Sequence, residues 1–107
     1  MSLEDMQKDV DAWAQQFKPA YWDVFHQHAR LSEEIGEVAR ELNHLFGSKK
    51  KKAGETENTL GKELADVIFT IVCMANSNNI NLEQEWKQMM EKKHWGRDNN
   101  RFERKNS

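Results

Sequence analysis

The sequence predicts an all-α fold, a four-helix bundle-like subunit formed by one domain that comprises residues 1–107. Apolar residues recur at helical spacing over long stretches, which is the strongest local signal for helices. No segment alternates between apolar and polar residues over a useful length, so β-strands are not indicated. The chain also contains only one proline and five glycines, the residues that break helices. Because the links between the predicted helices are short, an up-and-down bundle or a relative of one is expected.

The first two helices are delimited by capping residues and by the single proline. Ser2 followed by Asp5 resembles an N-terminal capping pair, and Pro19 ends the first helix. The second helix is expected over about 20–46, where an apolar stripe continues along the chain. Gly47 then supplies a stop signal.

A lysine-rich segment, 48–57, separates the second helix from the third and is predicted to be a solvated loop. Its lysines, 49–52, also allow a weaker hypothesis, in which the loop closes over bound phosphates as a mobile cover. Asn58 or Thr59 can cap a third helix that runs to about Ser77. The second and third helices are therefore expected to be antiparallel neighbours.

A fourth helix is expected after an asparagine-rich turn. Asn81, with Gln84 three residues later, resembles a capping box, and the helix is expected to end near Gly96. A charged C-terminal tail, 97–107, follows. The whole chain is polar, and a chain of this length buries only a modest core, so a homo-oligomer is expected.

Composition excludes several classes of function. The net charge of −2 gives no electrostatic basis for binding nucleic acid. The mean hydropathy is −0.96, and no run approaches the roughly 20 apolar residues of a membrane span. The single cysteine, Cys73, lies in an apolar stretch, excludes an internal disulfide and is interpreted as an inert core thiol. A cytoplasmic location is expected.

Two of the predicted helices carry the same acidic pattern. Glu34 and Glu37 lie on the second helix, and Glu63 and Asp66 lie on the third. In both, the order is carboxylate, aliphatic residue, small residue, carboxylate and valine. Carboxylates three residues apart share one helical face, and both pairs fall beside the apolar stripe. Each helix thus places two carboxylates next to its buried surface.

Four carboxylates at a half-buried seam repel one another and resist loss of water. A divalent cation removes this cost, and ligands that are all oxygens favour Mg²⁺, Mn²⁺ or Ca²⁺ over zinc. Because Mg²⁺ commonly binds phosphate oxygens, a phosphorylated molecule is the expected ligand. The pattern therefore predicts a metal-binding acidic cluster that acts on a phosphorylated molecule.

The two-part motif resembles that of a known family. Glu33-Glu34-x-x-Glu37 followed by Glu63-x-x-Asp66 is similar to the signature of the MazG-like nucleotide pyrophosphohydrolases. These belong to the all-α NTP pyrophosphatase superfamily, together with the dimeric dUTPases and the dCTP pyrophosphatases. The resemblance covers most of the chain and is closest to the short, single-domain bacterial members.

The resemblance implies hydrolysis of an NTP or dNTP between its α- and β-phosphates, which gives the monophosphate and pyrophosphate. It also implies that Glu34, Glu37, Glu63 and Asp66 bind Mg²⁺, with Mn²⁺ as a second option. Glu33 is implied as an accessory carboxylate that helps to hold a second metal or to orient the attacking water. A homodimer or homotetramer is the implied assembly. The base preference is left open.

The resemblance also suggests residues that bind the substrate. Lys93, Arg97 and Arg101 occupy positions at which the family uses basic residues to hold phosphates. Trp95 departs from the asparagine expected among close relatives. Trp22 is the chosen candidate to cover the base, from a set of aromatic residues whose alternative role is in the core. This set comprises Trp13, Phe17, Tyr21 and Trp22.

Two alternatives compete with this interpretation. Glu41-x-x-His44 and Glu91-x-x-His94 suggest a di-iron bundle, but Glu91 lies well away from the apolar stripe of its helix. The second alternative is a non-enzymatic helical interaction module in which the acidic patch is a partner surface.

Overall fold

The structure is a computed structural model, and it describes residues 1–47 and 60–105. Along these residues it contains helices and no strand, which confirms the all-α prediction. A π-helical segment, η1, continues directly from α4, and a short 3₁₀ turn, η2, follows it. In chain order the elements are α1 (Leu3–Ala14), α2 (Val24–Phe46), α3 (Leu60–Ser77), α4 (Leu82–Gln88), η1 (Met89–Arg97) and η2 (Asp98–Asn100).

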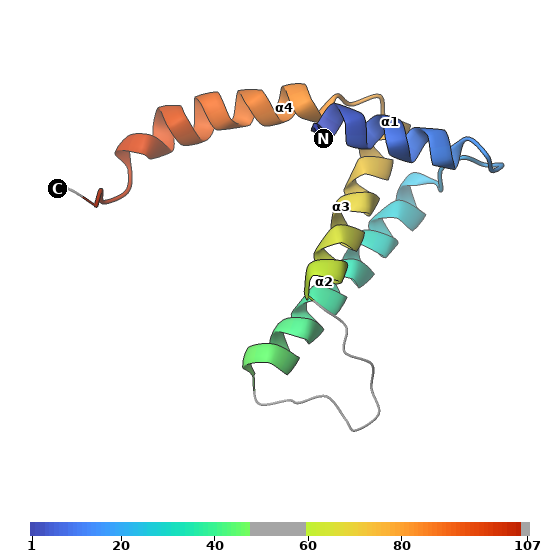
Figure 1. Ribbon diagram of the computed structural model, residues 1–107, viewed down its shortest axis with the longest axis horizontal. Coiled ribbons are helices and arrows are strands. Elements are labelled where there is room, and N and C mark those ends of the chain that lie inside the picture. Colours follow the sequence, from blue (N-terminus) through green and yellow to red (C-terminus); the bar gives the residue numbers. More distant parts are fainter. Residues whose placement is uncertain (48–59, 106–107) are drawn as a thin grey trace.

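The helices form a packed body and a projecting arm (Figure 1). Helices α2 and α3 lie side by side and run antiparallel, as predicted, and α1 crosses the end of this pair. Helix α4 and η1 extend away from the α2–α3 pair and do not lie along it. The predicted helices are therefore present, but in one chain the fourth does not pack alongside the second and third.

Capping side chains decide where α1 and α2 begin. The hydroxyl of Ser2 accepts a hydrogen bond from the Asp5 amide at 3.0 Å, and the Asp5 carboxylate accepts one from the Ser2 amide at 3.1 Å, which confirms the predicted capping box. Helix α2 begins at Val24, later than expected. The Asp23 carboxylate satisfies the free amides of Phe25 and His26 at 2.9 and 3.0 Å, so the chain before it stays non-helical.

The predicted boundaries at Gly47 and Asn81 are accurate, whereas α1 ends at Ala14, before the predicted end at Pro19. Gly47 is the C-cap of α2, and a Cβ atom there would lie 2.4 Å from the Asn43 side chain, so the close approach itself favours glycine. Asn81 caps α4 by accepting a hydrogen bond from the Gln84 amide at 3.1 Å. The loop at 48–57 and the two predicted capping residues after it lie outside the described residues.

The apolar core of one chain is thin. Among the described residues, the fully buried apolar side chains are Ala14, Val72 and Ala75. The radius of gyration is 17.8 Å, whereas a compact domain of this length has about 13 Å. Large apolar side chains such as Phe25 and Phe46 are exposed along α2. This surface fits the expectation of a homo-oligomer.

A polar network joins α1 to the end of α3 and the start of α4. The Gln7 side-chain nitrogen donates to the Asn76 side-chain oxygen at 2.9 Å and to the Ile80 carbonyl at 2.8 Å. Its side-chain oxygen accepts from the Leu82 amide at 2.9 Å. The Asn76 nitrogen donates in turn to the Gln7 carbonyl at 3.0 Å and to the Tyr21 hydroxyl at 3.1 Å. One asparagine thus fixes α1 and the α1–α2 linker on α3.

We expect Asn76→Ala to lower the free energy of unfolding by about 2 kcal/mol, because it removes three hydrogen bonds and leaves their partners unsatisfied. Urea denaturation at one protein concentration measures the change. Asn78→Ala is the matched control, because Asn78 is exposed in the turn after α3 and its shortest hydrogen bond is to the Met74 carbonyl, four residues earlier. Equal losses in the two variants would contradict the structural role of the network.

Candidate active site

Three predicted carboxylates converge at the seam between α2 and α3. Glu34 and Glu63 are buried, with 4% and 5% of their surface exposed, and Asp66 is exposed beside them. One carboxylate oxygen from each residue lies within 4.8 Å of the others. The antiparallel pairing of the helices brings together side chains that are far apart in the sequence. The described residues contain no other cluster of three potential metal ligands.

Glu37 and Glu33 lie at the edge of this cluster. Glu37 is half-exposed, lies 3.9 Å from the Arg40 guanidinium, and acts electrostatically on Glu63. The Glu33 side chain is 69% exposed, and its carboxylate lies 3.5 Å from Arg30. The structure thus brings Glu37 near the buried carboxylates, whereas Glu33 lies on the outer side of α2.

The electrostatics of the seam disfavour the simultaneous ionisation of its four predicted carboxylates, those of Glu34, Glu37, Glu63 and Asp66. Burial raises the pKa of Glu63 above its usual value, and the nearby charges of Asp66 and Glu37 raise it further. Glu34 and Glu41 add smaller contributions to the same pKa. A cation at this position relieves the repulsion, because it favours the charged form of every carboxylate around it.

Glu41 is a part of the acidic seam that the sequence interpretation did not assign. It lies one turn after Glu37 on α2 and is 4% exposed, and its charge contributes to the raised pKa of Glu63. Its carboxylate lies 3.9 Å from the nearly buried His44 ring. The signal was present in the sequence, because positions 34, 37 and 41 share one helical face.

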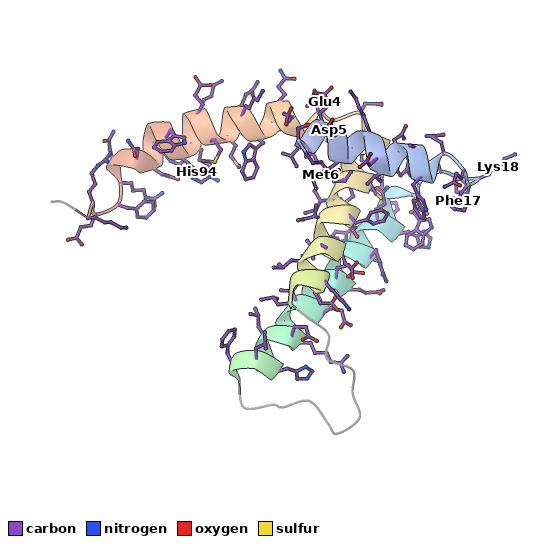
Figure 2. The ribbon with its side chains drawn as sticks, viewed as in Figure 1. Glu4, Asp5, Met6, Phe17, Lys18 and His94 are labelled. Carbon is purple, nitrogen blue, oxygen red and sulfur yellow. The ribbon has the colours of Figure 1, made fainter. Side chains whose placement is uncertain are left out.

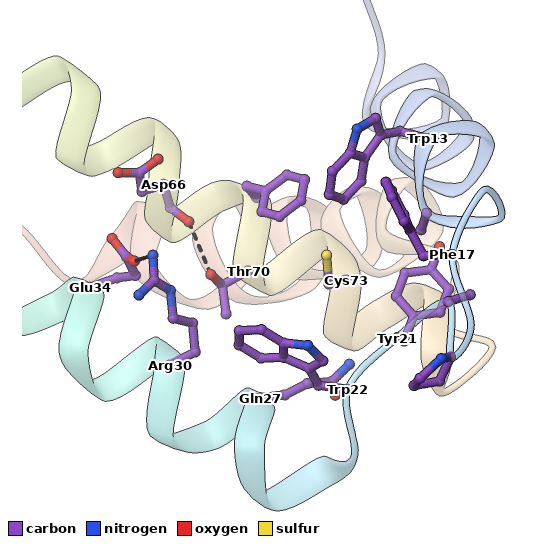
Figure 3. Close-up of a pocket in the computed structure, with 14 residues that line it drawn as sticks. Trp13, Phe17, Tyr21, Trp22, Gln27, Arg30, Glu34, Asp66, Thr70 and Cys73 are labelled. Atoms are coloured by element: carbon purple, nitrogen blue, oxygen red, sulfur yellow. Dashed lines mark hydrogen bonds and ion pairs between the residues drawn. The ribbon is translucent and has the colours of Figure 1, made fainter.

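Arg30 is the second residue that the sequence interpretation missed. It lies one turn before Glu34 on α2, and its guanidinium pairs with the Glu34 carboxylate at 2.7 Å. Figure 3 shows this ion pair beside Asp66. The guanidinium therefore provides a positive charge at the edge of the acidic cluster.

A cavity of about 630 Å³ adjoins the acidic cluster. Such a volume is typical of pockets for small molecules. Glu34 and Asp66 form one end, and aromatic side chains from α1, the α1–α2 linker and α3 form the other (Figure 3). Trp13 packs edge-on against both Phe17 and Phe69, with ring centroids 5.0 and 5.8 Å apart. The aromatic lining residues are Trp13, Phe17, Tyr21, Trp22 and Phe69.

The structure places Trp22 at this cavity, but not on a helix as expected. Because α2 starts only after Asp23, Trp22 belongs to the linker between α1 and α2. Cys73 also lines the cavity, and burial raises the pKa of its thiol, which keeps it protonated. This direction agrees with the interpretation of Cys73 as inert.

The predicted phosphate-binding residues lie elsewhere in the chain. Lys93, Arg97 and Arg101 belong to the arm that projects from the body, and the described residues lining the cavity do not include them. Arg97 and Arg101 lie 3.1 and 3.8 Å from the Asp98 carboxylate. Trp95, on the same arm, is exposed.

The arm also carries the second Glu-x-x-His pair. Figure 2 shows His94 on this arm, away from α2, and its ring lies 3.1 Å from the Asp98 carboxylate. His44, which belongs to the first pair, lies on α2. Within the described chain the two pairs therefore do not face each other, and the di-iron alternative is not supported.

Tyr21 is held at the aromatic end of the cavity by two hydrogen bonds. Its hydroxyl donates to the Asp11 carboxylate at 2.6 Å and accepts from Asn76 at 3.1 Å. Burial and the hydrogen bond to Asp11 raise the pKa of Tyr21 to about 12. The neutral phenol is therefore the stable form in the folded protein.

Comparison with known proteins decides the family. Residues 26–102 match the model of the MazG nucleotide pyrophosphohydrolase domain. The chain belongs to the MazG nucleotide pyrophosphohydrolase family. It is thus a MazG-type hydrolase, which confirms the resemblance and removes the non-enzymatic alternative.

Similar proteins support this assignment. The MazG chain is 43% identical to the protein YpjD of Bacillus subtilis (strain 168) over 104 residues, which cover 97% of this chain and 93% of YpjD. A crystal structure of Bacillus subtilis YpjD matches with a TM-score of 0.78 and 42% identity, covering 88% of this chain and 96% of that one. The Bacillus-conserved MazG protein, a nucleotide pyrophosphohydrolase, matches with a TM-score of 0.74 and 44% identity, covering 86% and 88%.

None of the helices in the described part of this MazG chain is both long and apolar enough to cross a membrane.

We expect the stability of metal-free protein to depend on Glu63. The pKa of Glu63 is raised in the folded state. The contribution of its protonated carboxyl to the free energy of unfolding is therefore complete below the usual pKa of 4.5 and is lost as the pH rises through the raised pKa. Glu63→Gln should therefore flatten the fall of the unfolding free energy over this range, measured by urea denaturation with a chelator present. Glu4→Gln, which changes an exposed glutamate on α1, should leave the fall as in the wild type.

The phenol of Tyr21, the only tyrosine, can be titrated by its ultraviolet absorbance. We expect an apparent pKa of about 12 in the native protein and a lower value in Asp11→Asn, because the charged acceptor holds the proton. The contribution of the protonated Tyr21 phenol to the free energy of unfolding is complete below its usual pKa near 10 and is lost as the pH rises through about 12. Asp9→Asn serves as the control, and an equal shift in both variants would contradict the assignment.

Proposed function

We propose that this MazG protein is a Mg²⁺-dependent nucleoside triphosphate pyrophosphohydrolase. It converts an NTP or dNTP to the monophosphate and pyrophosphate. The observation that carries the proposal is the convergence of Glu34, Glu63 and Asp66 at one end of a cavity whose other end is aromatic. Acidic groups that hold a cation suit the phosphates, and aromatic rings suit a base.

In this proposal Glu34, Glu63 and Asp66 hold the metal together with Glu37. Their chemistry fits a hard cation, because every donor is a carboxylate oxygen and two of the groups are buried. Mg²⁺ is favoured and Mn²⁺ is compatible. When bound, the metal supplies charge neutralisation at the phosphates and lowers the pKa of a water molecule.

The chain's own residues then orient the reacting groups. Glu33 is proposed as an accessory carboxylate that helps to hold a second metal or to orient the attacking water, because it lies next to Glu34 in the chain and pairs with the same Arg30 side chain. Trp22 is proposed to stack on the base, since it lines the cavity on the other side of Arg30 from Glu34 (Figure 3). A nucleotide bound in this way points its phosphates towards the acidic seam.

The basic residues of the arm require a second copy of the chain. Lys93, Arg97 and Arg101 extend away from the acidic seam of their own chain. We therefore propose that they bind phosphates in the site of a neighbouring copy, within a homodimer or homotetramer. Exposed apolar side chains on α2 and α3, including Ile35, Leu64 and Ile68, provide surface for such an assembly.

A panel of NTPs and dNTPs, assayed with and without Mg²⁺, tests the function. We expect release of pyrophosphate, not orthophosphate, and at least about a 100-fold loss of kcat/KM in Glu37→Gln and Asp66→Asn, because each removes a ligand charge. Glu4→Gln, on α1, should retain wild-type activity. Turnover of no nucleotide by the folded wild-type protein, or full activity in both variants, would refute the proposal.

A further inference from the structure

Arg30 is the only cationic side chain among the described residues that line the cavity. It lies on α2 between Trp22, at the aromatic end, and Glu34, at the acidic end (Figure 3). Both ends of the cavity thus lie within reach of one guanidinium. A molecule that occupies both ends must pass this side chain.

The present contacts of Arg30 leave part of its hydrogen-bonding capacity available. One terminal nitrogen pairs with Glu34 at 2.7 Å, and the other lies 3.5 Å from the Glu33 carboxylate. A guanidinium has five N–H donors in a planar fork, which matches the oxygens of a phosphate group. The side chain is about half-exposed, so it can change partner without disturbing the packing.

The order of groups in a nucleotide agrees with the order of residues along the cavity. A base at Trp22 and terminal phosphates at the acidic seam place the sugar and its attached phosphate between them. Arg30 occupies this intermediate position. Charge-assisted bidentate contacts with phosphate are among the strongest hydrogen bonds in proteins.

We propose that Arg30 is a substrate-binding residue that holds the phosphate attached to the sugar and that pairs with Glu34 while the metal site is empty. The inference rests on the proposed function, because it assumes a nucleotide in this cavity. A cation that binds Glu34 competes with the guanidinium for the same carboxylate. Metal binding therefore releases Arg30 towards the phosphate, and substrate and metal support each other's binding.

The first test compares nucleotides with nucleosides. Equilibrium binding of dAMP, dCMP, dGMP, dTMP and the four corresponding deoxynucleosides is measured at saturating Mg²⁺, and the affinity ratio reports the contribution of the phosphate. We expect Arg30→Gln to lower this ratio about tenfold without weakening nucleoside binding. Arg30→Lys should retain part of the nucleotide-to-nucleoside affinity ratio, because lysine keeps the positive charge but lacks the planar guanidinium donors.

Arg40→Gln is the matched control. Arg40 lies on the same helix, is similarly exposed, and lies 3.9 Å from another acidic residue, Glu37, but it does not line the cavity. The ratio in Arg40→Gln should stay close to that of the wild type. An unchanged ratio in Arg30→Gln, equal losses in both variants, or a wild-type protein that does not prefer the nucleotide would overturn the proposal.

The second test uses Mn²⁺ alone, detected by its electron paramagnetic resonance, without nucleotide. We expect Arg30→Gln to bind Mn²⁺ more tightly than the wild type, and by a larger factor than Arg40→Gln, because the 2.7 Å competitor for Glu34 is removed. Equal or weaker binding would overturn the exchange between guanidinium and metal. Pyrophosphate release by the wild type tests the proposed function separately, so the two failures can be distinguished.

Discussion

The structure depends on one electrostatic constraint, the burial of like charges at the seam between α2 and α3. Glu34 and Glu63 are buried there beside Asp66, and the raised pKa of Glu63 shows that the folded chain resists this charge. Purely structural packing would favour apolar residues at these positions. The two helices thus retain an arrangement that is costly without a cation and that becomes favourable with one. Such a cost in stability is common at functional sites, and it agrees with the metal binding proposed for this cluster.

The remaining elements position the rest of the cavity around this seam. The network of Gln7, Asn76 and Tyr21 attaches α1 and the linker to the far end of α3, where a thin apolar core alone gives little support. The late start of α2, set by Asp23, keeps the linker non-helical, and Trp22 on this linker lines the cavity. Polar contacts at the helix ends therefore determine the distance between the aromatic and acidic ends of the site.

The parts of this arrangement that were predictable from the sequence are the local ones. Helical periodicity placed Glu34 and Glu37 on one face and Glu63 and Asp66 on another, and the short chain between the helices implied their pairing. Capping chemistry located Ser2, Gly47 and Asn81. The direction of the arm was not predictable, because it depends on contacts across the chain and on exposed apolar surface. Arg30 was missed because an arginine one turn before a glutamate is indistinguishable in sequence from a surface ion pair.

For the proposed function, charge balance explains why the described residues of one chain would not complete the site. When ionised, Glu34, Glu37, Glu41, Glu63 and Asp66 carry five negative charges, against two positive charges on Arg30 and Arg40, and one divalent cation still leaves this group negative. A triphosphate adds further negative charge to the same small volume. In the proposed assembly, Lys93, Arg97 and Arg101 of a second copy supply the missing cations, because the arm that carries them extends away from the acidic seam of its own chain. The same exposed apolar surface that leaves one chain poorly packed can bring the arm of a second copy to this point. Oligomerisation and catalysis are therefore expected to depend on the same contacts.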